Sequence, residues 1–114
     1  MAITVEASGT QSATVGTEHS LATATTAGVY IFEVDTAAMA QYDVLELRVK
    51  TIILAAGAVR VLFYGAFYGA QNAEDVIKVS IPVPLDATAA NLTVSLKQTF
   101  GTSRSFPWKL LKSA

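Results

Sequence analysis

The sequence predicts an all-β domain, an antiparallel β-sandwich or small barrel of about seven to nine strands. Three observations support this fold class. Apolar and polar residues alternate with a period of two in several stretches, and turn residues separate these stretches at intervals of about 12 residues. Only residues 36–41 have a pattern compatible with a helix, so we expect at most one short helical turn there.

The N-terminal segment differs from the rest of the chain, because residues 1–26 are rich in Thr, Ser and Ala and poor in large apolar side chains. Small β-branched residues form strands, but they bury little apolar surface. We expect residues 1–26 to form two or three short peripheral strands, or an arm that becomes ordered only in an assembly. The single predicted domain spans residues 1–114, with its core in residues 29–111.

Two strands are predicted next, over residues 29–35 and 43–51. The first is rich in β-branched and aromatic residues, which favour strands. In the second, Leu45, Leu47 and Val49 alternate with charged residues. A period of two is typical of a strand with one buried face, so these three side chains are predicted to point into the core.

Residues 59–68 are apolar on both faces of the predicted strand, apart from Arg60. This pattern favours a central strand that is covered on both sides, by a second sheet or by another subunit. A hairpin loop at residues 55–58 is predicted to precede the strand, and Gly57 is expected to supply the positive φ of the turn.

The sequence Phe-Tyr-Gly-Ala occurs twice in succession, at residues 63–66 and 67–70. In a strand, a repeat of four places both phenylalanines on one face and both tyrosines on the other. The glycines permit a bulge or the close approach of another backbone. Such aromatic residues suit a stacking platform for a ligand, or core packing and subunit contact. We favour the second interpretation, because no basic groove accompanies them.

Residues 76–84 alternate as well. Four of their apolar side chains are predicted to point inward: Ile77, Val79, Ile81 and Val83. Pro82 and Pro84 then lie on the outward side, where a missing N–H indicates an edge or a strand end.

Two predicted strands complete the domain, over residues 91–99 and 104–111. The side chains predicted to point inward from the first are Leu92, Val94 and Leu96. Those that share one face of the second are Phe106, Trp108 and Leu110. Pro107 cannot donate to a neighbouring strand, so this last strand is predicted to lie at a sheet edge.

The chain is apolar for its size, since 52% of its 114 residues are hydrophobic and 15% are charged. About 25% charged is usual for soluble domains, and a domain of this size buries only about two thirds of its unfolded surface. We therefore expect other protein subunits to cover part of the surface, including further copies of the chain in a closed homo-oligomer such as a trimer. The predicted interface residues are aromatic: Phe63, Tyr64, Phe67, Tyr68, Phe106 and Trp108.

Charge, cysteine content and hydropathy argue against several other classes. The net charge is −1 and the basic residues are scattered, so we expect no nucleic-acid partner. No run of about 18 apolar residues predicts a membrane span, and the start of the chain lacks the pattern of a signal peptide. The absence of cysteine excludes disulfides and thiolate chemistry.

Chemistry-bearing residues are few and dispersed. His19 stands beside Glu18, a pair that can bind a metal or orient a base, but one histidine without cysteine makes a poor metal site. Most carboxylates, Asp43 among them, fall at predicted turns or on polar strand faces, where we expect them to be solvated. Nucleophile and phosphate-binding motifs are absent. We therefore expect no catalytic residue, no metal or cofactor, and no enzymatic activity.

Five segments together carry a resemblance to a known group of proteins. They are MAITVEASGT (1–10), TAGVYIFEVDT (26–36), DVLELRVKT (43–51), SIPVP (80–84) and LKQTFGTSRSFPW (96–108). On these segments the sequence resembles small proteins encoded among the virion genes of tailed phages of proteobacteria, and the resemblance extends over most of the chain. The resemblance supplies no functional residues.

The resemblance implies a structural protein of a phage particle, foremost a decoration (cement) protein on the capsid surface. Its partners would be the major capsid protein or other virion proteins, and its location the virion, assembled in the cytoplasm of the bacterial host. Two alternatives stay open. One is a tail or head–tail connector component. The other is a carbohydrate-binding or receptor-binding β module that uses Tyr64, Tyr68 or Trp108 as a sugar platform.

Overall fold

The computed structural model describes residues 2–113, and within them it has nine strands and no helix. The strands are β1 (Ile3–Ser12), β2 (Glu18–Ala24), β3 (Gly28–Asp35), β4 (Val44–Thr51), β5 (Arg60–Tyr68), β6 (Ile77–Val79), β7 (Val83–Leu85), β8 (Leu92–Phe100) and β9 (Ser105–Ser113). The predicted all-β fold class is therefore confirmed.

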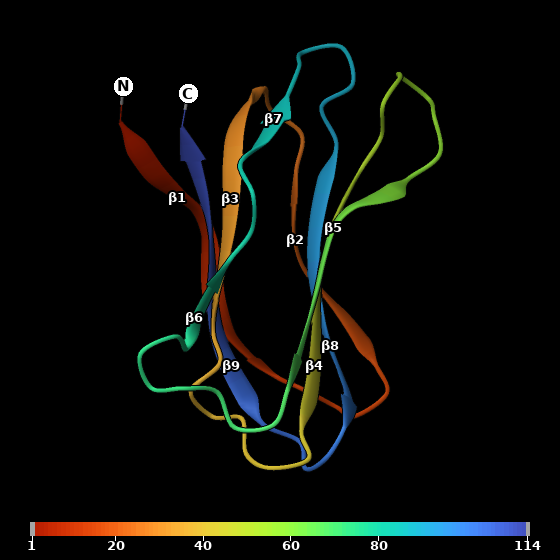
Figure 1. Ribbon diagram of the computed structural model, residues 1–114. Helices are drawn as coiled ribbons and strands as arrows, with labels where there is room; N and C mark the ends of the chain where they lie inside the picture. Colours follow the sequence, from red (N-terminus) through yellow and green to blue (C-terminus); the bar gives the residue numbers. More distant parts are fainter. Residues whose placement is uncertain (1, 114) are drawn as a thin grey trace.

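The strands form two antiparallel sheets that face each other as a β-sandwich (Figure 1). Sheet A has the order β1-β9-β3-β6, and β7 also pairs with β3. Sheet B has the order β2-β8-β4-β5. The first strand pairs with the last, so that Ile3 lies opposite Ser113 at one end of the sandwich.

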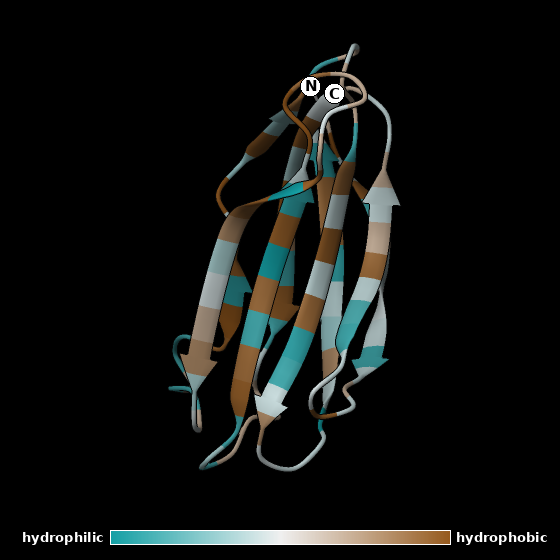
Figure 2. Cartoon of the chain, turned by 90° about the vertical axis from the view of Figure 1, so that its right-hand side faces the viewer, coloured by the Kyte–Doolittle hydropathy of each residue, from teal (hydrophilic) through white to brown (hydrophobic). Residues whose placement is uncertain are grey.

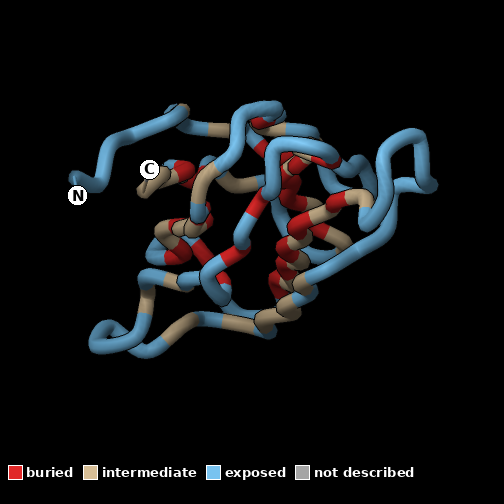
Figure 3. Tube along the Cα trace, turned by 90° about the horizontal axis from the view of Figure 1, so that it is seen from above, coloured by how far each residue is buried: buried red, intermediate tan, exposed pale blue. Residues whose placement is uncertain are grey.

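The core lies between the sheets, where alternate side chains of both sheets meet. The bands along the strands in Figure 2 follow this alternation, and the buried segments in Figure 3 lie inside the sandwich. The largest fully buried side chains include Tyr30, Phe32, Leu45, Leu92, Leu96, Phe106 and Leu110. Each contributes about 1.5–3 kcal/mol by its removal from water. The inward direction predicted for alternate residues of β4 and β8 is confirmed.

The strand predicted over residues 76–84 differs from the prediction in its register. Three side chains expected to point inward are about half exposed: Ile77, Val79 and Ile81. Val83 is buried as expected. The segment breaks at Ser80, which is buried because its Oγ accepts the N–H of Phe32 at 2.9 Å. The break leaves β6 and β7 as two short edge pieces, both paired with β3.

Two predictions about strand position are wrong. Residues 60–68 form an edge strand rather than a central one, because among residues 2–113 β5 pairs with β4 alone. The last strand, in contrast, lies inside sheet A between β1 and β3. Its pairing with β3 ends at Val34 and Trp108. Pro107 lies just outside this paired stretch, so its missing N–H removes no hydrogen bond to β3.

Residues 36–42 form tight turns and no helix. The N–H of Met39 donates to the carbonyl of Thr36 at 3.1 Å, and the carboxylate of Asp35 accepts the N–H of Ala37 at 2.9 Å. An Asp side chain that accepts the N–H two residues further on stabilises a tight turn. Residues 36–42 therefore form turns in place of the expected helical turn.

Residues 3–24 form β1 and β2, at the edges of sheets A and B. β1 pairs with β9, and β2 pairs with β8. Most of their side chains are exposed, which agrees with the small size and polarity of the residues in this segment. Ala24 at the end of β2 and Ala13 just after β1 are buried and join the core.

A buried polar cluster closes the end of the sandwich opposite Ile3 and Ser113. Asp43 is 1% exposed and accepts bonds from the Arg104 guanidinium at 2.8 Å and from the N–H of Ala40 at 2.9 Å. The fully buried Gln98 amide donates to the carbonyl of Thr102 at 2.6 Å. The expectation that Asp43 is solvated is therefore wrong, because distant loops supply its partners.

Candidate interaction surface

The most prominent exposed apolar surface follows β5 and the loop that precedes it. β4 holds β5 in a register that places Arg48 opposite Tyr64, and Val44 opposite Tyr68. Both tyrosines therefore lie on the outer face of sheet B, and they are 50% and 71% exposed. The opposite edge of β5 has no strand beside it in the described chain, so its outward main-chain groups are free to pair.

The loop between β4 and β5 extends this surface. Ile53 and Leu54 near its tip are 74% and 73% exposed. Figure 3 shows the loop leaning away from the body of the sandwich. Ala56 has a φ of 62° and supplies the left-handed residue of the turn, which corrects the prediction for Gly57. Gly57 is needed for another reason, because a Cβ there would lie 2.9 Å from the carbonyl oxygen of Leu54.

We call this surface the β5 edge surface. It consists of Ile53, Leu54, Val59, Val61, Leu62, Tyr64 and Tyr68. Given the exposed fractions of these side chains, the β5 edge surface presents on the order of 800 Å² of largely apolar area. One partner in a standard protein interface buries about the same area. A recess of about 250 Å³ adjoins it, between Leu62 and the segment that contains Pro84 and Leu85.

Polar contacts fix the orientation of Tyr64. Its hydroxyl donates to the carboxylate of Glu46 at 2.7 Å, and the guanidinium of Arg48 donates to the other oxygen of Glu46 at 2.8 Å. The guanidinium also lies 5.0 Å from the centre of the Tyr64 ring. The hydrogen bonds from Tyr64 and Arg48 lower the pKa of Glu46, although its partial burial acts to raise it. The hydrogen bond to Glu46 in turn raises the pKa of Tyr64. These contacts hold Tyr64 against Glu46 and Arg48 of β4.

A second group of charges covers the rest of the outer face of sheet B. Lys50 lies 2.6 Å from the carboxylate of Glu18, which also accepts the hydroxyl proton of Ser95 at 2.6 Å. The bonds from Lys50 and Ser95 lower the pKa of Glu18 despite its partial burial. Because these groups satisfy one another, this part of the sheet is a polar surface beside the apolar β5 edge.

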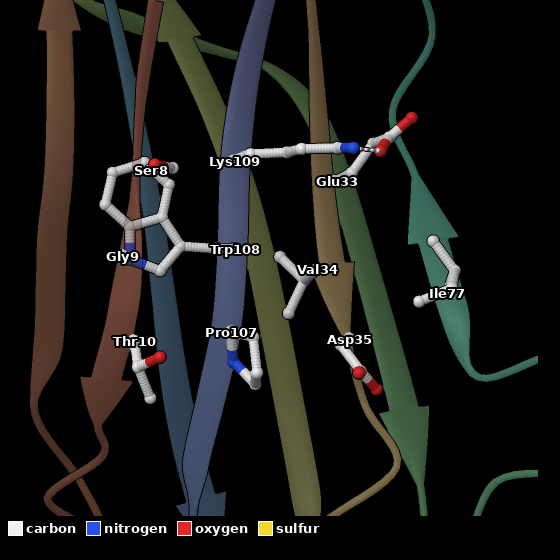
Figure 4. A pocket seen from close by; sticks show the side chains of 10 residues that line it. All are labelled: Ser8, Gly9, Thr10, Glu33, Val34, Asp35, Ile77, Pro107, Trp108 and Lys109. Carbon is white, nitrogen blue, oxygen red and sulfur yellow. Dashed lines mark ion pairs between the residues drawn. The ribbon is translucent and has the colours of Figure 1, made fainter. Parts of the chain in front are cut away.

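Sheet A carries a shallow groove of about 500 Å³ on its outer side (Figure 4). Glu33 pairs with Lys109 at 3.4 Å, and Asp35 accepts the N–H of Ala37. Both carboxylates therefore already have partners. Trp108 lies beside Gly9 of the neighbouring strand β1, and a Cβ at Gly9 would touch its indole at 3.5 Å. The groove offers an ion pair and hydroxyl groups, without an unpaired acid and base.

A further apolar patch lies on sheet A near the paired ends of β1 and β9. Ile3 and Val5 of β1 are 67% and 57% exposed. Val5 lies opposite Leu111, which in turn lies opposite Ile31 of β3. These residues form an apolar row across three strands. This patch on sheet A is separate from the β5 edge surface on sheet B.

The predicted interface residues fall into three groups. Tyr64 and Tyr68 are exposed, as a contact surface requires. Phe63, Phe67 and Trp108 are partly buried and pack against the core. Phe106 is fully buried in the core and is not at the surface.

The sequence interpretation missed the contribution of Ile53 and Leu54. The signal for it was the long apolar run from Ile52 to Ala70. Residues 59–68 of that run were predicted to form a covered strand and residues 55–58 a hairpin loop, so Ile53 and Leu54 were given no role.

The single histidine has a structural role in this fold. Nε2 of His19 accepts the N–H of Thr14 at 3.0 Å, and Nδ1 lies 3.3 Å from the amide nitrogen of Gln11. His19 thereby ties the turn between β1 and β2. Within residues 2–113, no group of three or more His, Cys, Asp or Glu side chains could hold a metal ion.

Among the residues that the structure describes, none belongs to a helix long and apolar enough to cross a membrane. Comparison with protein-family models, with curated proteins and with solved structures found no match to this chain.

Proposed function

We propose that this protein is a structural subunit of a tailed-phage particle, a decoration (cement) protein that stabilises the capsid by packing against other subunits. The observation that carries the proposal is the β5 edge surface, where apolar side chains and free main-chain groups lie together on a small domain. Contiguous apolar areas of this size are typical of protein interaction sites.

The second apolar patch supports the same role. A cement protein binds a repeating shell and contacts its own neighbours, so it needs more than one adhesive surface. The patch around Ile3 and Val5 lies on sheet A, and the β5 edge surface belongs to sheet B. The major capsid protein is the proposed partner of one surface, in a virion assembled in the host cytoplasm. The resemblance of the sequence to phage virion proteins gives this partner its identity.

Quantitative mass spectrometry of particles purified from the phage that encodes the chain tests the proposal. A cement protein is expected at hundreds of copies per particle, whereas a tail or head–tail connector component is expected at tens or fewer. Absence of the protein from intact particles would exclude a virion role of either kind.

Binding of purified variants to particles that lack the protein tests the surface itself. Leu54→Asp places a charge in the β5 edge surface and is expected to lower occupancy about tenfold or more, since a desolvated charge costs several kcal/mol. Val15→Asp is a matched control, because Val15 is an exposed apolar residue in the turn between β1 and β2. Equal occupancy of both variants would place the contact elsewhere.

A carbohydrate-binding role is the second candidate, since Tyr64 and Tyr68 present two exposed rings on one face of sheet B. Exposed aromatic faces suit stacking on sugars. Trp108 is partly buried against the core and does not supply such a platform. Binding to a glycan array that Tyr68→Ala abolishes would support this role, and an array without any bound glycan would remove it.

A further inference from the structure

The edge of β5 differs from the other open edges of the sandwich in its lack of protection. Soluble proteins guard sheet edges with charges, prolines, bulges or very short strands. β1 carries a bulge and Glu6, and β6 and β7 are three residues each with prolines in or beside β7. β2 carries a bulge and Glu18. On β5, the bulge lies near Leu62, and residues 63–68 beyond it have neither a charge nor a proline.

We propose that β5 pairs with β5 of a second copy of this chain, antiparallel and about a two-fold axis, so that two B sheets become one continuous sheet. The pairing extends the packing role proposed above and gives one of its surfaces a defined partner. It supplies main-chain hydrogen bonds to the edge groups that lack them within one copy. A two-fold pair also differs from the trimer that the composition suggested, because one strand edge can pair with only one other.

The repeated Phe-Tyr-Gly-Ala sequence makes β5 complementary to itself. Side chains that face each other in a continuous antiparallel sheet lie on the same side of it. With Ala66 at the axis, Tyr64 of each copy lies opposite Tyr68 of the other on the outer face. Cross-strand aromatic pairs stabilise sheets.

The area available is sufficient for a stable pair. The β5 edge surface offers on the order of 800 Å² on each copy, and a standard interface buries about that area per partner. The loop between β4 and β5 leans outward from the sandwich, as Figure 3 shows, and would lie against the end of the partner strand.

Sedimentation equilibrium measures the association directly. The chain has a mass of 12.0 kDa, so a pair is expected near twice that value. Ala66→Asp places two carboxylates face to face at the axis and is expected to raise the dimer Kd about 100-fold or more. Thr10→Asp on the exposed edge strand β1 is the matched control and should leave the Kd unchanged. Circular dichroism confirms that both variants are folded.

Cross-linking tests the register. The chain has no cysteine, so Ala66→Cys introduces a single thiol. With Ala66 at the axis, the two thiols meet, and mild oxidation is expected to give a covalent dimer quickly. Thr10→Cys should give it slowly, at the rate of random collision.

A wild-type chain that is monomeric at 100 µM, or equal cross-linking of the two cysteine variants, would overturn the inference. A monomeric chain that is still found in particles would overturn the β5 pairing and leave the packing role standing. A dimeric chain that is absent from particles would overturn the packing role and leave the pairing standing.

Discussion

At the scale of single residues, the buried carboxylate of Asp43 shows how polar groups hold the loops at one end of the sandwich. Burial alone raises the pKa of Asp43, but bonds from the N–H of Ala40, from Arg104 and from the N–H of Thr102 outweigh burial and lower it. No local pattern predicts this, because Arg104 lies 61 positions away in the sequence. The turn at Asp43 was predictable, and its partners were not.

Asp43→Asn is expected to lower the free energy of unfolding at neutral pH by about 1.5–3 kcal/mol, because hydrogen bonds to a charged group are lost. The pKa of Asp43 is lower in the folded state, so its contribution is present above the ordinary pKa of Asp and disappears as pH falls through the folded value. Urea unfolding measured between about pH 7 and pH 2 should therefore show the gap between wild type and variant closing in acid.

Glu6→Gln on the exposed strand β1 is the control for this pH dependence and should follow the wild type throughout. A gap between wild type and Asp43→Asn that stays constant with pH would contradict the role assigned to the carboxylate.

Gly101 also depends on Asp43. Its φ is +97°, and a Cβ there would lie 2.8 Å from the Cα of Asp43. Gly101→Ala is expected to cost about 3 kcal/mol or more, from left-handed strain together with the clash. Gly16 has a φ of +89° with open space around it, so Gly16→Ala should cost only the strain, about 1–2 kcal/mol. Equal denaturation midpoints for the two variants would show that the contact with Asp43 is relaxed without cost.

At the scale of elements, the alternation of apolar residues predicted β4 and β8 well. Both strands lie inside sheet B with one face on the core, so their pattern of burial follows the pattern of the sequence. β5 and β6 were interpreted less well. An edge strand that presents apolar residues to a partner has the same sequence pattern as a covered central strand, and the pattern alone cannot distinguish them. β6 follows its own register because Ser80 bonds to β3.

Leu96→Ala in β8 is expected to lower the free energy of unfolding by about 2–5 kcal/mol, because Leu96 is fully buried and its removal leaves a cavity. Lys97→Ala, on the outward side of the same strand, should change it by less than about 0.5 kcal/mol. Thermal or urea unfolding of the two variants measures both values. Similar losses for both would mean that the register of β8 is wrong.

At the scale of the whole molecule, the first and last strands depend on each other. β9 is the sole partner of β1 in the described chain and one of the partners of β3. It also places Phe106 and Leu110 in the core, at 0% and 1% exposure. The sequence pattern indicated that residues 104–111 contribute to the core. It could not show that they lie at the centre of sheet A, since strand order depends on pairing between distant segments.

Removal of residues 105–114 is therefore expected to abolish cooperative unfolding, because β1 loses its partner and the core loses two large side chains. Removal of residues 1–5 takes only exposed side chains from β1 and should lower the Tm by about 5 °C at most. Differential scanning calorimetry distinguishes the two outcomes. A sharp transition in the first variant would show that sheet B folds without sheet A.

The pairing of β1 with β9 has a consequence for synthesis on the ribosome. Sheet B has all its strands once Phe100 has emerged, whereas sheet A must wait for Ser113. Until β9 has left the ribosome, β1 has no partner strand and sheet A cannot fully cover the inner face of sheet B. During that interval, the inner face of β4 and β8 and the edge of β5 are both accessible to neighbouring chains on the same messenger RNA. Chaperone binding to ribosome-bound chains in which a C-terminal linker places the tunnel exit between these two points would measure this exposure.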